Sequence, residues 1–171
     1  NYLLVSVVTY LVFNCFLRFT LSSSVEGDQA EQLIAAQWWA PGYEVQPGTI
    51  QPPLYTYLVI IASNLFGGHG RLALLLVRIL LLTASAWSLH RLCGHFFLSS
   101  NQVVIAFASA SMMPQLIWEA QRDLTHTLLG TSLSLLFVLF VLRLNQQSSL
   151  ASYLVVGVLA GLCFLAKYTI L

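Results

Sequence analysis

The chain has 171 residues, of which 58% are hydrophobic and only 8% are charged, with 7 Lys and Arg against 6 Asp and Glu. Soluble domains carry roughly 25% charged residues, so this composition excludes an ordinary soluble enzyme, and the apolar content excludes intrinsic disorder. A formal net charge of +1 gives no electrostatic basis for binding nucleic acid. An integral membrane protein remains, in which each ionisable side chain is costly and is therefore a candidate functional residue.

Five apolar segments are predicted to cross the bilayer, which indicates an all-α, polytopic transmembrane helix bundle. A spanning helix needs about 20 mainly apolar residues. The predicted spans are residues 2–21, 72–93, 102–118, 125–144 and 150–171. Because the chain begins on Asn1 and stops at Leu171 inside an apolar run, we expect residues 1–171 to be the N-terminal transmembrane module of a longer chain.

Two further helices are predicted in the first loop, both lying on the membrane rather than crossing it. Residues 28–40 mix apolar and polar side chains at helical spacing and end at Pro41-Gly42, so they indicate an amphipathic helix. Residues 54–66 are apolar, but as a helix they reach only about 20 Å, less than the ~30 Å hydrocarbon core. We expect this segment to be an interfacial or re-entrant juxtamembrane helix.

The placement of residues 54–66 decides which acidic side chains can cooperate. If this segment crosses, Asp28 and Asp123 lie on opposite faces of the membrane; if it does not, both lie on one face. Counting positive charges would place the acid-bearing face in the cytoplasm, or would make residues 54–66 a span, so the positive-inside rule leaves the orientation ambiguous. In the second arrangement most of the cations lie near the acid-bearing face, namely Arg18, Arg71, Arg78, Arg122 and Lys167.

The first acidic group directly follows the first span. Asp28 and Glu31 are three residues apart, so a helix places them on one face. A carboxylate at a membrane surface can act as a general base toward a hydroxyl or an amine. The alternative is purely structural, because acidic residues in the first turn of a helix are favoured by its dipole.

The second acidic group lies between two predicted spans. Glu119, Asp123 and His126 fall at spacings of four and three, so a helix would gather two carboxylates and an imidazole on one side. Such a set suits a divalent metal ion or the positioning of a phosphate. The alternative is an ordinary polar loop that contains an Arg122–Asp123 ion pair.

The remaining candidate site residues are three cations. Arg78 lies about two turns inside an apolar span, too deep to be ignored, and we expect it to have a partner. Arg71 and Lys167 lie nearer the ends of their segments. These two could bind a lipid phosphate or could extend their charged ends to the interface.

These motifs resemble the N-terminal part of the C-type integral-membrane glycosyltransferases. The resemblance rests on Gly27-Asp28-Gln-Ala-Glu31, Gln51-Pro-Pro-Leu-Tyr, Arg122-Asp123 and Gly161-Leu-Cys-Phe-Leu-Ala-Lys167-Tyr168, taken in this order. It is strongest for the branch of protein O-mannosyltransferases and lipid A aminoarabinose transferase, which use a polyprenyl-phosphate sugar.

The resemblance implies a function and roles for the candidates. Asp28 is then the catalytic carboxylate, and the donor phosphate is bound by Lys167, Arg78, Arg122 and Gln51. Asp123, with Glu31 and His126, would hold a divalent metal ion or orient the donor; no other cofactor is expected. The aminoarabinose transferases have a lysine where this chain has Gln51, which leaves a phosphate contact there open.

The implied reaction moves a sugar from a polyprenyl-phosphate donor to a lipid or protein acceptor at the outer face of a membrane. We expect the protein to be an integral protein of the bacterial inner membrane. Two other classes fit the composition, a transporter or flippase for a lipid or small solute and a non-catalytic membrane subunit. Transporters place polar groups near the midplane and contain internal repeats, whereas here the charges cluster near one interface and no repeat is visible.

Overall fold

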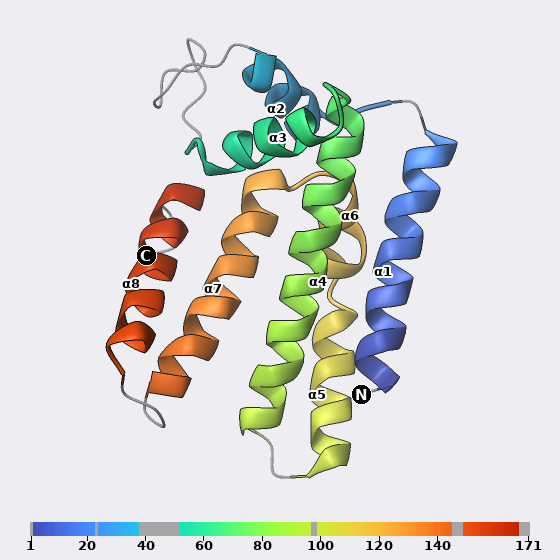
Figure 1. The fold of residues 1–171 in the computed structure, drawn as a ribbon. Coiled ribbons are helices and arrows are strands. Elements are labelled where there is room, and N and C mark those ends of the chain that lie inside the picture. Colours follow the sequence, from blue (N-terminus) through green and yellow to red (C-terminus); the bar gives the residue numbers. More distant parts are fainter. Residues whose placement is uncertain (1, 23, 38–51, 97–98, 145–148, 168–171) are drawn as a thin grey trace.

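The computed structural model describes residues 2–22, 24–37, 52–96, 99–144 and 149–167, and within these ranges every regular element is a helix. The long helices run up and down beside one another, and two shorter helices lie across one end of the bundle (Figure 1). The all-α bundle with juxtamembrane helices in the first loop is therefore confirmed.

Three helices in the described part of the chain are long and apolar enough to cross a membrane, α1 (Tyr2–Leu21), α4 (Gly70–Phe96) and α7 (Thr125–Leu144). The predicted bounds of α1 and α7 are confirmed, and α4 extends beyond the predicted 72–93 at both ends. The last predicted span is the shorter apolar helix α8 (Leu150–Ala166), and residues 168–171 lie outside the described residues. α4 is central, packing against α1, α3 and α7.

The prediction of one continuous span over residues 102–118 is wrong. The chain forms α5 (Ser100–Ser111), breaks before Pro114, and continues as a π-helical turn η1 (Gln115–Glu119) and the short α6 (Ala120–Arg122). A proline lacks the N–H that a helix needs and its ring clashes with the preceding turn. The break leads the chain into the polar turn at Asp123, and π-helical turns of this kind are frequent at functional sites.

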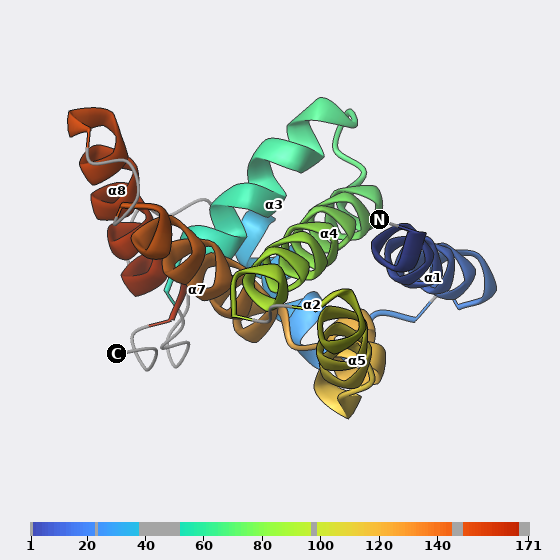
Figure 2. The ribbon, with the colours of Figure 1, turned by 90° about the horizontal axis from the view of Figure 1, so that it is seen from below.

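The two helices across the end of the bundle are α2 (Gly27–Gln37) and α3 (Leu54–Leu65). α3 lies obliquely over α4 and α7 instead of running parallel to them (Figure 2), so it does not cross the membrane, as its length predicted. Its buried face, with Tyr55 and Val59 completely enclosed, joins the core shared with α4, α7 and α8. Residues 38–40 of the predicted 28–40 helix lie outside the described residues.

A tight turn carries the chain from α3 into α4. Gly67 and Gly68 have φ values of 60° and 90°, which residues with a side chain rarely adopt. The reversal sends α4 down the centre of the bundle, so that the end of α1, the start of α4 and the start of α7 lie at the same end as α2 (Figure 1).

Candidate active site

The two acidic loops meet at this end of the bundle. The backbone N–H of Asp28 donates a hydrogen bond of 3.1 Å to Oδ1 of Asp123, 95 residues further along the chain. Asp28 lies in the first turn of α2, where unpaired N–H groups and the helix dipole attract negative charge. The arrangement in which both acids share one face is therefore the observed one.

The Asp123 carboxylate sits in an electrostatically unfavourable place. Burial raises the pKa of Asp123, and so do the neighbouring Asp28 and Glu26 carboxylates, whereas the Asp28 N–H and the Arg78 charge act in the opposite direction. When the pKa of a carboxyl is higher in the folded protein than in the unfolded chain, its ionisation destabilises the fold. The stability that the protonated carboxyl contributes is therefore fully present at low pH and is lost as the pH rises through the folded pKa. The next residue, Leu124, is strained as well, with φ of 40°.

Arg78 has the partners that its depth in α4 predicted. Its side chain is 9% exposed; Nη1 donates to the carbonyl of Gln121 at 2.8 Å and Nη2 to the carbonyl of Asp123 at 3.4 Å. These bonds tie the turn between α6 and α7 to the central helix. The guanidinium therefore helps to hold Asp123 against the start of α2.

A buried polar network fixes α2 over the bundle. The Thr56 hydroxyl donates to Oε1 of Gln32 at 2.6 Å, and Nε2 of Gln32 lies 2.9 Å from Nε2 of His126. Since the Gln32 amide nitrogen can only donate, His126 Nε2 accepts. The Tyr55 ring packs on the same imidazole with 5.6 Å between ring centroids. Sequence analysis missed Gln32, Tyr55 and Thr56, although polar residues inside an amphipathic helix are the signal that could have found Gln32.

Replacing Gln32 with methionine is expected to destabilise the protein by about 1–3 kcal/mol, because a hydroxyl and an imidazole nitrogen lose their buried partner. Gln37→Met makes the same chemical change at an exposed position of the same helix. Thermal unfolding of the full-length protein in detergent measures both variants. Equal melting temperatures for Gln32→Met and Gln37→Met would show that the network does not hold α2.

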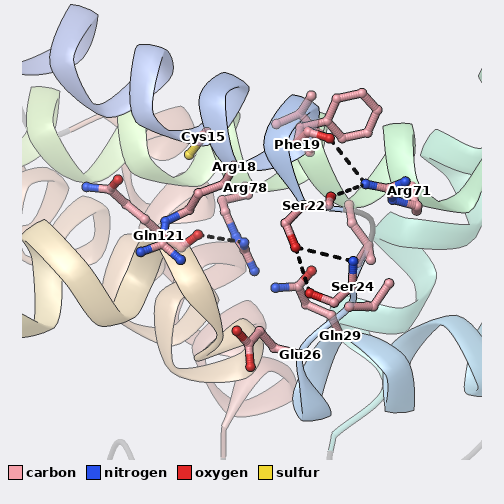
Figure 3. Close-up of a pocket in the computed structure, with 13 residues that line it drawn as sticks. Cys15, Arg18, Phe19, Ser22, Ser24, Glu26, Gln29, Arg71, Arg78 and Gln121 are labelled. Carbon is pink, nitrogen blue, oxygen red and sulfur yellow. Dashed lines mark hydrogen bonds between the residues drawn. The ribbon is translucent and has the colours of Figure 1, made fainter.

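Three arginines line one cavity beside the carboxylate pair. This cavity of about 90 Å³ lies between α1, α2 and α4, and we call it the arginine pocket; its charged and amide lining is Arg18, Arg71, Arg78, Glu26, Gln29 and Gln121. Figure 3 shows Arg18, Arg78 and Gln29 around this pocket, on three different helices, with the Arg18 guanidinium near Gln121. Arg18 was not predicted as a site residue, because a cation in the last turn of a span is usually taken for an interface anchor.

Arg71 has a mainly structural position at the rim of this pocket. Nη2 donates to the carbonyls of Phe19 and Ser22 at 3.2 and 2.7 Å, and its guanidinium lies over the Phe19 ring. Arg71 therefore caps the C-terminal end of α1, because it donates to carbonyls that the helix leaves unpaired.

Lys167 lies in a different cavity. Its Nζ donates to the Thr127 hydroxyl at 3.0 Å. It lines a groove that follows one face of α7 along Thr127, Thr131, Ser134 and Val138, with Leu92 of α4 on the other side. The charges of Lys167 and Asp28 both act on His126. The predicted phosphate ligands Lys167 and Arg78 therefore line two separate cavities at the same end of the helix bundle.

The predicted metal set is not brought together. The described part of the chain holds no group of three or more His, Cys, Asp or Glu side chains that could bind a metal ion. His126 directs Nε2 at Gln32, and Glu31 is not among the charges that act on Asp123. The donor set therefore does not fit a metal held by these three residues. The other predicted ligands, Gln51 and the side chain of Arg122, lie outside the described residues.

Comparison with known proteins places the chain in a family. The family model described as dolichyl-phosphate-mannose-protein mannosyltransferase matches residues 50–171. The lipopolysaccharide core galacturonosyltransferase RgtB of Rhizobium johnstonii is 36% identical over 163 residues, which cover 95% of this chain and 32% of that protein. RgtA of the same organism, with the same description, is 31% identical over 166 residues, covering 95% and 31%.

No solved structure matches the chain. The chain spans about a third of the length of the curated relatives it matches. The family model covers well over half of the chain, including the positions of Arg78, Asp123 and Lys167. This chain belongs to the dolichyl-phosphate-mannose-protein mannosyltransferase family of membrane proteins.

Proposed function

We propose that this chain carries the acceptor-activating part of a membrane glycosyltransferase that takes its sugar from a polyprenyl-phosphate donor. The observation that carries the proposal is the bond between the Asp28 N–H and the Asp123 carboxylate, which gathers two acids from separate loops at one end of the bundle. The family's description names a dolichyl-phosphate donor. The relatives are described as transferring galacturonate to lipopolysaccharide core, so we propose a hexuronate donor and a glycolipid acceptor.

Asp28 has the position and chemistry of the general base. Its carboxylate takes the proton of the acceptor hydroxyl as that oxygen forms a bond to the anomeric carbon. The bond between the anomeric carbon and the phosphate oxygen breaks, and the electron pair leaves with polyprenyl phosphate. Asp123 fixes the start of α2, and with it Asp28, through the N–H bond. No step is assigned to a metal ion.

The groove at Lys167 suits the lipid-linked phosphate. It has a volume of about 470 Å³, and its apolar wall from Leu92, Leu135 and Val138 lies along the bundle where a polyprenyl chain would lie. Lys167 stands at its end beside Thr127. An ammonium group there stabilises the negative charge that develops on the departing phosphate. Gln51 and Arg122 stay proposed as further phosphate contacts.

We also propose the bacterial inner membrane as the location, with the α2–α3 end at its outer face, because both relatives come from a bacterium and are described as acting on lipopolysaccharide. The same placement puts the arginine-rich end opposite to what charge counting favours. Cations that line a site for anionic substrates account for that excess.

The test is a transfer assay with the purified full-length protein in lipid vesicles. Polyprenyl-phosphate galacturonate is expected to donate its sugar to a lipopolysaccharide core acceptor, and nucleotide-linked galacturonate is expected to give no product. Product from the nucleotide donor alone would overturn the donor class. Movement of the lipid-linked sugar across the vesicle membrane without any transfer would instead support the flippase alternative.

A further inference from the structure

The arginine pocket has the features of a built anion site. Arg78 is nine-tenths buried, yet its Nε–H finds no acceptor within the described residues. Arg18 stacks on the Trp118 ring at 4.6 Å and donates no hydrogen bond to any other described residue. Three arginines and one carboxylate, Glu26, line the pocket, so its lining has an excess of positive charge that a bound anion would compensate. The guanidinium groups of Arg18 and Arg78 can therefore donate hydrogen bonds to an anion in this pocket.

The chemistry of the lining limits what that partner can be. The pocket is small, about 90 Å³, and its charged and amide lining is mostly guanidinium and amide groups. Planar guanidinium groups bind carboxylates and phosphates through paired hydrogen bonds. The lining of the pocket is therefore suited to a carboxylate or a phosphate group.

The position of the pocket relates it to the reacting carbon. Glu26 and Gln29, on either side of Asp28 in the chain, line the pocket, and Arg78 binds the carbonyl of Asp123. In a hexuronate only C5 and the ring oxygen separate the carboxylate carbon from the anomeric carbon. A sugar whose anomeric carbon lies at Asp28 can thus place its carboxylate among these arginines.

We propose that the arginine pocket binds the C6 carboxylate of the donor hexuronate, with Arg18 and Arg78 as the specificity-determining residues. This inference rests on the proposed function. Lys167 and its groove supply a separate place for the donor phosphate and its lipid, which leaves the carboxylate as the donor anion without a partner. The pocket then selects a uronate over a neutral hexose.

The test compares two donors that differ only at C6, polyprenyl-phosphate galacturonate and polyprenyl-phosphate galactose, in the full-length protein. Arg18→Gln is expected to lower the ratio of kcat/KM for the uronate over the neutral donor by about 10- to 100-fold, the value of a hydrogen bond to a charged group. Arg18→Lys keeps the charge but loses the planar guanidinium, so its ratio is expected to lie between those of the wild type and Arg18→Gln. Arg143→Gln, at an exposed position in the last turn of α7, is the matched control and should leave the ratio unchanged.

A second variant changes the ratio in the opposite direction. Glu26 is the one carboxylate among the described lining residues, so Glu26→Gln is expected to raise the preference for the uronate donor, a gain that misfolding cannot produce. An unchanged ratio in both Arg18→Gln and Glu26→Gln would overturn the inference, as would an equal loss with both donors in a variant that retains the wild-type melting temperature. Wild-type protein that transfers from neither donor would instead contradict the proposed function itself.

Discussion

Replacing Asp28 with asparagine is expected to lower the rate of sugar transfer by about 10²- to 10⁴-fold, the usual contribution of a general base. Asparagine has the same shape, but its amide cannot accept the proton of the acceptor hydroxyl. The contact between the two loops uses the backbone N–H of residue 28, so it survives the substitution. Transfer from the lipid-linked donor, followed with time in the full-length protein, measures the loss.

The stability of this variant separates a catalytic role from a structural one. The change removes a favourable charge from the first turn of α2, worth about 0.3–1 kcal/mol, but it also removes a negative neighbour of Asp123. We therefore expect the free energy of unfolding to stay within about 1 kcal/mol of the wild type. Glu31→Gln, the equivalent change one turn further along the same helix, serves as control and should keep its activity. Near-normal transfer by Asp28→Asn would end the assignment of Asp28 as the base.

The bundle was predictable where a single physical property determines an element. α1 and α7 have the predicted bounds because apolar runs of spanning length end at polar residues on both sides. The position of α3 across the bundle followed from its length alone, because a helix of 12 residues is too short to cross ~30 Å of hydrocarbon. Both predictions rest on local sequence and on the thickness of the bilayer.

The break at Pro114 was visible in the sequence but was misinterpreted. Residues 102–118 are mainly apolar and lie between polar clusters, which favoured one span. Transmembrane helices do tolerate proline when neighbouring groups satisfy the freed backbone. Here the chain forms a π-helical turn and ends soon afterwards at Arg122. Which outcome follows depends on tertiary packing, which the local pattern does not record.

The site was predictable in its acids and less so in its cations. Asp28 and Asp123 could be paired from the topology, since only one arrangement of residues 54–66 brings them to the same face. The division of the cations between two cavities depends on which faces of α1, α4 and α8 turn toward one another. Hydropathy does not distinguish Arg18 from Lys167, because both are cations at the end of an apolar segment. In the structure Arg18 lines the arginine pocket, whereas Lys167 lines the groove along α7.

Replacing Arg78 with methionine is expected to destabilise the protein by about 2–4 kcal/mol, since two backbone carbonyls lose a charged donor. Methionine fills much of the volume of the arginine stem, so the loss reports the hydrogen bonds rather than a cavity. The carbonyls of Gln121 and Asp123 flank the turn into α7. Thermal unfolding of the full-length protein measures the loss. Arg143→Met, which removes an exposed guanidinium that lies over the Trp87 and Phe140 rings, should cost no more than about 1 kcal/mol.

Arg78→Lys distinguishes the structural contribution of Arg78 from its contribution to the site. Lysine keeps the positive charge but cannot reach two carbonyls with one planar group, so its melting temperature is expected to fall between those of wild type and Arg78→Met. If Arg78 only ties the turn to α4, transfer in the two variants will follow their stability. We expect a difference in transfer that stability does not explain. At a temperature where both variants are folded, Arg78→Lys should retain markedly more transfer than Arg78→Met, because lysine preserves the positive charge beside Asp123 and in the arginine pocket.

Two results would contradict these expectations. Equal transfer by the two variants at that temperature would mean that Arg78 only holds the turn. Wild-type stability in Arg78→Met would show that α4 does not position the acidic pair.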